Sequence, residues 1–240
     1  MWMICKKEWR QFFSSLTGYI ALTIFLLLNG LLFFVFPDTS LLNFGYATLD
    51  SFFRLAPWVL LFLVPTITMR SLADEYKAGT FELLKVLPLR PAEIVWGKFF
   101  GALLVILLAL LPTIIYAVSI QLLSAVGGID VGSTIGSYIG LFMLGAVFTG
   151  IGICASSFTN NTVVAFITGA FACFLLFNGF SAISKLPLFA GTPAYYIEML
   201  GINNHYASIS KGVVDIRDVV YFAGIILVSM LITQQNVAKR

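Results

Sequence analysis

The chain has 240 residues, of which 60% are apolar and 10% are charged, and its formal net charge is +3. Soluble domains contain about 45–50% apolar and about 25% charged residues, so this composition excludes a water-soluble globular protein. The small net charge does not favour nucleic acid as a partner, because a nucleic-acid-binding surface needs a clear excess of basic residues.

Residues 1–16 have the pattern of an amphipathic helix lying in the membrane interface. On a helical wheel of about 100° per residue, apolar and aromatic residues share one sector and basic residues lie beyond its edge. The sector contains Trp2, Cys5, Trp9, Phe12, Phe13 and Leu16. Lys6, Lys7 and Arg10 lie beyond one edge, and Glu8 and Gln11 lie beyond the other. Two interpretations stay open: a simple membrane anchor, or an elbow helix that also contacts a cytosolic partner.

Six runs with few or no charged residues predict membrane-spanning helices, because about 20 apolar residues cross the hydrocarbon layer. The expected spans are residues 17–36, 52–69, 99–123, 133–155, 162–182 and 216–233. The first run exceeds the roughly 7–15 apolar residues of a secretory signal peptide, so we expect it to be retained. A β-barrel is excluded, because its strands alternate in polarity over about ten residues. We therefore predict an all-α polytopic protein in which residues 17–240 form a single six-helix membrane domain.

The segment 70–98, between the second and third expected spans, combines many charges with signals for helix ends. Gly79 favours the end of a short helix over 71–77, and Thr80 is suited to cap a second one. Pro88 would break that second helix, and Pro91 would begin the next. The second helix would be amphipathic and would present Phe81, Leu83, Leu84 and Leu87.

This pattern has two explanations. From Pro91 the next helix has no further break until Pro112, so a force on the 70–98 segment would reach the third span. A loop whose apolar residues only touch the bilayer would give the same composition.

Glycines spaced by four residues predict close packing of helix backbones. Gly97 and Gly101 form one such ridge at the base of the third span, and Gly132, Gly136 and Gly140 form another at the start of the fourth. Packing within the chain and a seam between two copies both remain possible.

Residues 183–218, before the last span, are too long and too apolar for a plain loop. Tyrosines favour the interfacial depth of a membrane. We expect a short helical or re-entrant element in the outer leaflet, which includes Pro187, Pro193, Tyr195 and Tyr196.

The distribution of basic residues predicts the orientation of the chain. With the amino terminus inside, the inner segments 1–16, 70–98, 156–161 and 234–240 hold ten Lys and Arg residues and the outer segments hold four. Because Lys and Arg accumulate on the cytoplasmic side, we expect both termini in the cytoplasm.

The sequence offers no source of free energy of its own. The charge-free runs contain no acidic residue, histidine or arginine of the kind that marks proton relays and ion-coupled pumps. No GxxxxGK[ST] loop for nucleotide phosphates is present, and no HExxH or GxSxG motif. The cysteines Cys5, Cys154 and Cys173 show no metal-binding spacing. We predict no catalytic residue, no metal and no cofactor in this chain, and a separate partner that supplies the energy.

The segment between the second and third expected spans carries a motif that resembles the permease subunits of ABC-2 type exporters. The motif reads Glu75-x-x-x-Gly79-Thr80-x-Glu82-Leu83-Leu84, then Pro88-Leu89, then Glu93-Ile94-Val95-x-Gly97-Lys98. The order of the entry helix, six spans and this block agrees over nearly the whole chain. Within the family the chain is most similar to the gliding-motility-associated permeases of the GldF type, with NosY-like permeases next. Arg90 departs from the Ser or Thr that the family often has at this position.

The resemblance implies a permease subunit in the bacterial inner membrane, with the substrate path between two permease halves near the second and fifth spans. It implies that residues 75–87 form a coupling helix that docks on a separate GldA-like ATPase, which binds ATP and Mg²⁺. The implied coupling residues are Glu75, Gly79, Thr80, Phe81, Glu82, Leu83, Leu84 and Leu87. A second permease copy or a GldG-like component would complete the assembly, and residues 183–218 would form an outer gate.

A second hypothesis from another class is a membrane scaffold that holds a motility or secretion assembly and transports nothing itself. A third, an ion-coupled carrier, is disfavoured by the uncharged spans.

Overall fold

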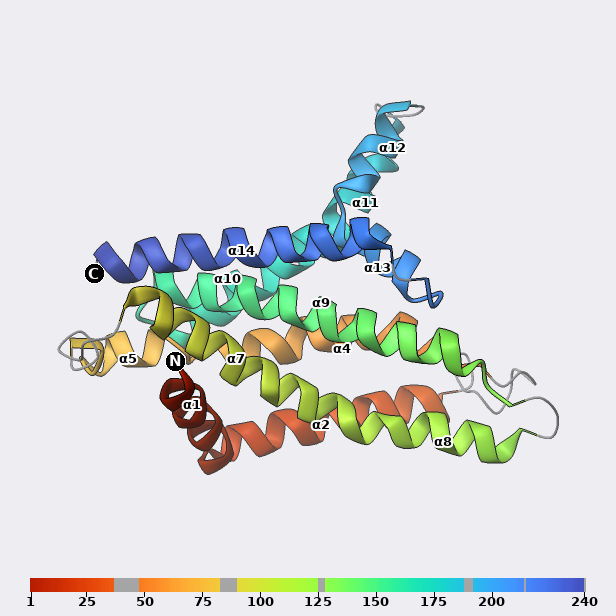
Figure 1. Ribbon diagram of the computed structural model, residues 1–240, viewed down its shortest axis with the longest axis horizontal. Coiled ribbons are helices and arrows are strands. Elements are labelled where there is room, and N and C mark those ends of the chain that lie inside the picture. The colour runs from red at the N-terminus through yellow and green to blue at the C-terminus, as the bar shows by residue number, and fades with distance from the viewer. Residues whose placement is uncertain (37–47, 83–89, 125–127, 188–191, 214, 240) are drawn as a thin grey trace.

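A computed structural model describes residues 1–36, 48–82, 90–124, 128–187, 192–213 and 215–239 (Figure 1). Every regular element in these residues is a helix, which confirms the predicted all-α class. Six helices among them are long and apolar enough to cross a membrane: Leu16–Phe34, Asp50–Lys77, Pro91–Leu123, Val131–Phe158, Thr162–Ser184 and Ile216–Lys239. Both termini lie at the same end of the bundle, which we call the terminal end.

Helix α1 (Trp2–Ser14) lies across the terminal end and is followed directly by α2 (Leu16–Phe34). Ser15 separates them with extended backbone angles, φ −98° and ψ 128°, so the chain turns sharply between the crosswise helix and the first span. Helix α1 packs along α7 (Pro91–Leu110) as well as against α2.

The second span, α4 (Asp50–Thr68), contains two internal prolines, Pro57 and Pro65. Proline removes a backbone donor and loosens the helix. Near its end the Thr68 hydroxyl donates to the Val64 carbonyl at 2.9 Å. A short helix α5 (Ala73–Lys77) follows, and Gly79, with φ of 69°, ends this stretch in the left-handed conformation that glycine adopts at least cost.

The third span begins where the sequence predicts it. Pro91 is the first residue of α7, and the Arg90 N–H donates to Glu93 Oε2 at 2.9 Å. At Pro112 the helix tightens into a 3₁₀ turn, η1 (Leu111–Thr113), and continues as α8 (Ile114–Leu123). The proline therefore changes the helix geometry without ending the span.

Helix α9 (Val131–Phe158) is the central element and packs against α4, α7, α10 and α14. It leads into α10 (Thr162–Phe174), which Asn161 caps by accepting the Val163 N–H. The fifth span then passes through a π-helical turn, η2 (Leu175–Gly179), into α11 (Phe180–Ser184). Figure 1 shows α11 turning away from the bundle and forming a projecting hairpin with α12 (Thr192–Met199). Helix α13 (Ile202–Ile209) returns to the bundle, and α14 (Ile216–Lys239) is the last span.

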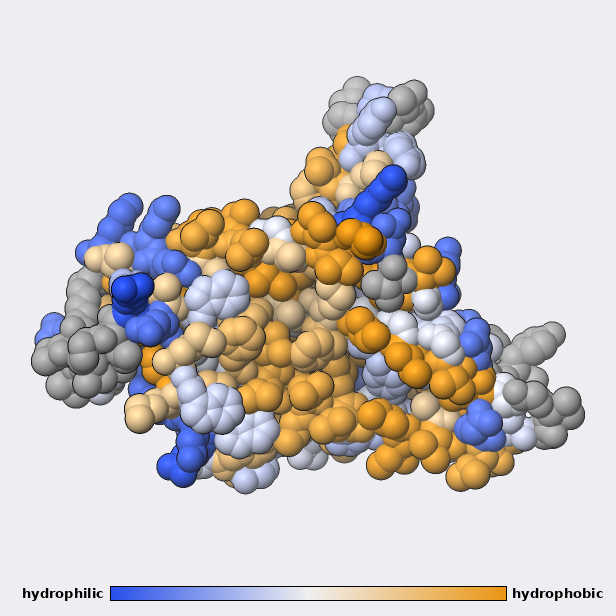
Figure 2. All heavy atoms as spheres, in the orientation of Figure 1, coloured by the Kyte–Doolittle hydropathy of each residue, from blue (hydrophilic) through white to orange (hydrophobic). Residues whose placement is uncertain are grey.

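The core is apolar and rich in aromatic rings. Phe33, Phe52, Tyr116 and Tyr138 bring rings from four spans together, with the centroids of Phe33 and Phe52 5.8 Å apart. The outside of the bundle is also apolar, and Figure 2 shows an apolar band over the helices with hydrophilic residues gathered at the terminal end. An apolar exterior of this extent is stable in a lipid bilayer and not in water.

Candidate functional site

Lys98 is the buried centre of an ionic cluster at the terminal end. Its side chain is 1% exposed, and its Nζ atom lies 2.7 Å from Glu8 Oε1 and 3.0 Å from Glu75 Oε1. The same ammonium group donates to the main-chain carbonyl of Ser71 at 2.6 Å. Lys7 adds a second cation, 2.8 Å from Glu75 Oε1. We call Lys7, Glu8, Glu75 and Lys98 the junction cluster.

The charges of the junction cluster cancel, and the Lys98 ammonium has an acceptor for each of its N–H groups. A lysine ammonium has three N–H donors, and Lys98 has three acceptors, in Glu8, Glu75 and Ser71. Burial of an unpaired ammonium would cost several kcal/mol, and the two carboxylates offset this cost. Glu75 Oε2 is buried and has no hydrogen-bond partner within the described residues, so Glu75 depends on its other oxygen.

The cluster joins three elements that are far apart in sequence. Lys7 and Glu8 belong to α1, Glu75 belongs to α5, and Lys98 belongs to the first turns of α7. The turn before α5 is also fixed to the central helix, because Ser156 Oγ accepts the N–H groups of Leu72 and Ala73 at 3.1 and 3.0 Å. These ion pairs and hydrogen bonds therefore hold α1, the segment around α5 and the first turns of α7 together.

The glycine ridge on α7 allows this arrangement. A Cβ atom on Gly97 would lie 2.9 Å from the Ile4 Cβ, and one on Gly101 would lie 2.8 Å from the Glu8 Cβ. Atoms cannot approach this closely without a shift, so both positions need glycine for α1 to lie against α7. At these two positions the glycines therefore face another helix of the same chain.

The predicted coupling residues divide into two groups by exposure. Gly79, Thr80 and Glu82 are exposed. Glu75 is 6% exposed and holds the junction cluster, and Phe81 is 5% exposed and packs its ring 4.8 Å from that of Tyr76. Glu75 and Phe81 therefore shape the segment from inside and do not form part of its surface. Leu83, Leu84 and Leu87 lie outside the described residues.

The aromatic residues of the interfacial helix form a continuous group. The ring of Phe13 lies 4.8 Å from that of Trp9 and 5.4 Å from that of Phe12, and Trp2 is 74% exposed. Cys5, which the helical wheel places in the same sector, faces the protein and is buried. Burial and the nearby Glu8 carboxylate raise the pKa of the Cys5 thiol, so it stays protonated at neutral pH.

We expect Gly97→Leu to displace α1 from α7, because the new side chain would overlap Ile4. Overpacking of this kind costs about 1–3 kcal/mol. The displacement would expose Cys5, so a maleimide should label it several-fold faster in a background where Cys154 and Cys173 are replaced by alanine.

Gly132→Leu is the matched control, because the nearest atom to a Cβ at that position is Asp130 Oδ1 at 3.4 Å. Labelling of Cys5 should not change in this variant. Equal labelling rates in the two variants would contradict the packing argument.

At the end of the bundle opposite the termini, the second glycine ridge receives α13 and the turn after it. A Cβ on Gly136 would lie 2.8 Å from the Gly212 Cα, and one on Gly140 would lie 2.6 Å from the Ile209 Cγ2. Gly132 makes no such approach. The Tyr206 hydroxyl donates to the Phe53 carbonyl at 2.6 Å, which fixes α13 to the second span.

The residues predicted for an outer gate lie on the projecting part of this segment. Pro187, Pro193, Tyr195 and Tyr196 are exposed, and the rings of the two tyrosines are 5.8 Å apart. Residues 183–218 thus contain a docked half around α13 and a projecting half around α12.

His205 connects α13 to the last span. Its Nδ1 lies 2.7 Å from Asp218 Oδ1 and its Nε2 lies 2.8 Å from the Met199 carbonyl. The imidazole stacks on Tyr221, with ring centroids 3.9 Å apart. This pair could not be predicted from the sequence, because the two residues belong to different helices.

We expect His205→Ala to lower the free energy of unfolding by about 1.5–3 kcal/mol, the range for a hydrogen bond to a charged group. The loss would leave the buried Asp218 carboxylate without this partner. Thermal unfolding of the purified chain in detergent measures the effect. Lys185→Ala, at an exposed position, should leave the midpoint unchanged, and an equal decrease in both variants would contradict the role of the pair.

Within the described residues, no group of three or more His, Cys, Asp or Glu side chains lies close enough to hold a metal ion. The junction cluster is a set of ion pairs that joins α1, α5 and α7.

The family model described as "ABC-2 family transporter protein" matches residues 2–210, which include the junction cluster and the first five spans. No curated protein matches the chain.

Proposed function

Because the chain belongs to the ABC-2 family of transporter proteins, we propose that it is the permease subunit of an ATP-binding cassette exporter. A separate subunit binds ATP and Mg²⁺ and hydrolyses the nucleotide. The observation that carries this proposal is the junction cluster, which ties an exposed connecting segment to the base of a membrane-spanning helix.

The exposed residues of the segment are the surface for the ATPase. Gly79, Thr80 and Glu82 are exposed at the terminal end, which faces the cytoplasm in this proposal. A displacement of this surface reaches α7 through the Glu75–Lys98 pair and reaches α1 through Lys98 and Glu8. Glu75 thus acts in coupling as a positioning residue, without direct contact with the partner.

The overall similarity of the sequence to gliding-motility-associated permeases supports a narrower proposal. The chain is a permease of the gliding-motility-associated type in the bacterial inner membrane, and it acts with a GldA-like ATPase. A second copy of the permease or a GldG-like component completes the assembly. The segment 183–218 forms the outer gate, in which α13 is held by Tyr206 and His205 while α12 projects.

The projecting hairpin favours a second candidate function. Its exposed Tyr195 and Tyr196 are suited to contact another membrane component, as a scaffold of a motility or secretion assembly would. The two functions differ in one measurement. A transporter reconstituted with its ATPase hydrolyses ATP faster when substrate is present, and a scaffold does not.

The proposed function is tested by replacing residues 78–80 and 82–89 with Gly and Ser, so that the length of the segment is unchanged. This replacement keeps Glu75, Lys98 and the buried Phe81, so the bundle should fold and unfold as the unaltered chain does. We expect it to lose copurification with the ATPase encoded by a neighbouring reading frame, and to lose stimulated ATP hydrolysis. Intact binding and transport in this variant would overturn the proposal.

A further inference from the structure

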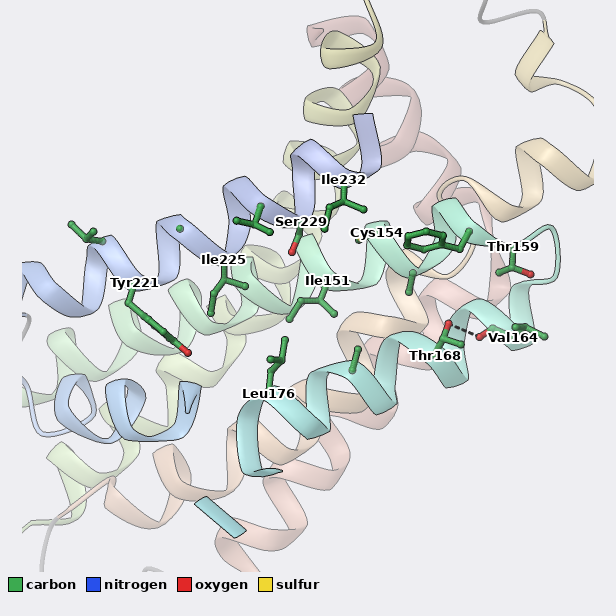
Figure 3. A pocket seen from close by; sticks show the side chains of 16 residues that line it. Ile151, Cys154, Thr159, Val164, Thr168, Leu176, Tyr221, Ile225, Ser229 and Ile232 are labelled. Carbon is green, nitrogen blue, oxygen red and sulfur yellow. Dashed lines mark hydrogen bonds between the residues drawn. The ribbon is translucent and has the colours of Figure 1, made fainter. Parts of the chain in front are cut away.

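A long apolar groove runs along α9 between α10 and α14 (Figure 3). Helix α9 packs against both neighbours, whereas α10 and α14 make little contact with each other, which leaves the groove between them. Its volume is about 1060 Å³. Small-molecule sites have about 300–1,000 Å³, so the groove has room for a ligand at or above the top of that range.

The length of the groove matches one leaflet of a bilayer. It extends along the fifth span from Val164 in α10 to Leu176 in η2, and along α14 from Val220 to Ile232. Each stretch advances by twelve residues, or about 18 Å at about 1.5 Å per residue. The hydrocarbon core of a bilayer is about 30 Å thick, so one leaflet contributes about 15 Å. A partner helix that crosses the membrane would need a contact surface along the full thickness.

The lining of the groove favours hydrocarbon. Figure 3 shows Leu176 of η2, Ile151 of α9 and Ile225 of α14 around the same space. The Thr168 hydroxyl donates to the Val164 carbonyl of its own helix at 2.8 Å, so it does not need a hydrogen-bond acceptor on a ligand. Gly224 adds depth, because no atom lies within 4 Å of a Cβ built there.

The terminal end of the groove is polar and cationic. There it shares Phe158 and Thr159 with an adjoining recess of about 460 Å³, which Lys77 and Asn161 also line. Lys77 is exposed, and no carboxylate of the described residues lies within ion-pair distance of it. The groove and the recess together suit a molecule with a long apolar body and a negatively charged head.

We propose that this groove binds an anionic phospholipid from the leaflet on the terminal side. Its acyl chains lie between α10 and α14, and its headgroup phosphate lies beside Lys77 and Asn161. The site is separate from the junction cluster and does not depend on an ATPase partner, so the proposal goes beyond the transport function.

The test measures lipid retained by the full chain purified in detergent, after exchange into phosphatidylglycerol or phosphatidylcholine with the same acyl chains. We expect several-fold greater retention of phosphatidylglycerol. Gly224→Leu fills the groove without a clash and should lower retention of both lipids several-fold. Lys77→Gln should remove the preference for phosphatidylglycerol and leave retention of phosphatidylcholine unchanged.

Two matched controls carry the same substitutions elsewhere. Gly132→Leu lies outside the groove, and Lys185→Gln lies at an exposed position of the outer segment, so both should behave as the unaltered chain. Val228→Trp provides a second filling variant at a 57% exposed position of the groove, should Gly224→Leu lower the unfolding midpoint.

Unchanged retention in both filling variants would overturn the proposal, and so would an unchanged preference in Lys77→Gln. A third contrary result is a change in the number of chain copies per particle, with lipid retention unaltered, in the filling variants. That outcome would show that the groove is an interface between copies of the chain.

Discussion

Lys98→Met is expected to destabilise the chain by about 3–5 kcal/mol, the cost of removing one partner from a buried ion pair. The substitution keeps most of the side-chain volume and removes the ammonium. Glu8 would then lose its ion-pair partner, Glu75 would keep only the half-exposed Lys7, and the Ser71 carbonyl would lose its donor. Thermal unfolding in detergent and the yield of monodisperse protein measure the loss.

Two variants separate the charge effect from general damage. Lys7→Met removes a cation whose side chain is 49% exposed, so its loss should cost at most about 1 kcal/mol. Adding Glu8→Gln and Glu75→Gln to Lys98→Met removes the two carboxylate charges that Lys98 had paired, and should recover much of the stability. If Lys98→Met unfolds at the same temperature as Lys7→Met, Lys98 is not the centre of the cluster.

The spans could be predicted because the thickness of the hydrocarbon layer sets their length. The positions of charged residues predict the ends of these helices less well. The last helix continues to Lys239, because its backbone hydrogen bonds persist after the chain leaves the apolar layer. No proline marks the π turn at Leu175–Gly179 in the sequence. The turn depends on packing around the fifth span, which the sequence does not show.

The junction cluster was only partly predictable. Gly97 and Gly101 indicated close packing, and Glu75 and Lys98 both belong to the motif, but nothing in the sequence paired them. The partner Glu8 lies 90 residues from Lys98. The helical wheel placed Glu8 at an edge of α1, and only the docking of α1 on α7 turns that edge inward. The inward position of Phe81 has the same origin, because amphipathic spacing does not say which neighbour an apolar side chain meets.

Glu82→Lys is expected to uncouple the permease from its ATPase while leaving the bundle folded. Glu82 is exposed and makes no ion pair within the described residues, so its substitution should change stability by at most about 0.5 kcal/mol. Reversing one charge at a complementary interface places like charges together and slows association. We expect at least a tenfold weaker affinity for the ATPase, about 1.4 kcal/mol, and a corresponding loss of stimulated hydrolysis.

Glu198→Lys is the matched control for the effect of the charge change on ATPase affinity. Glu198 is also exposed and undergoes the same change of charge, but it lies on α12, away from the terminal end. A docking surface at Glu82 predicts normal ATPase affinity for Glu198→Lys and weakened affinity for Glu82→Lys. Added salt should narrow the difference between the two variants, because screening reduces the repulsion between the new lysine and the positive charges that it faces on the partner. Equal affinity in the two variants would mean that the exposed tip of the segment is not where the partner binds, even if the junction cluster still holds the bundle together.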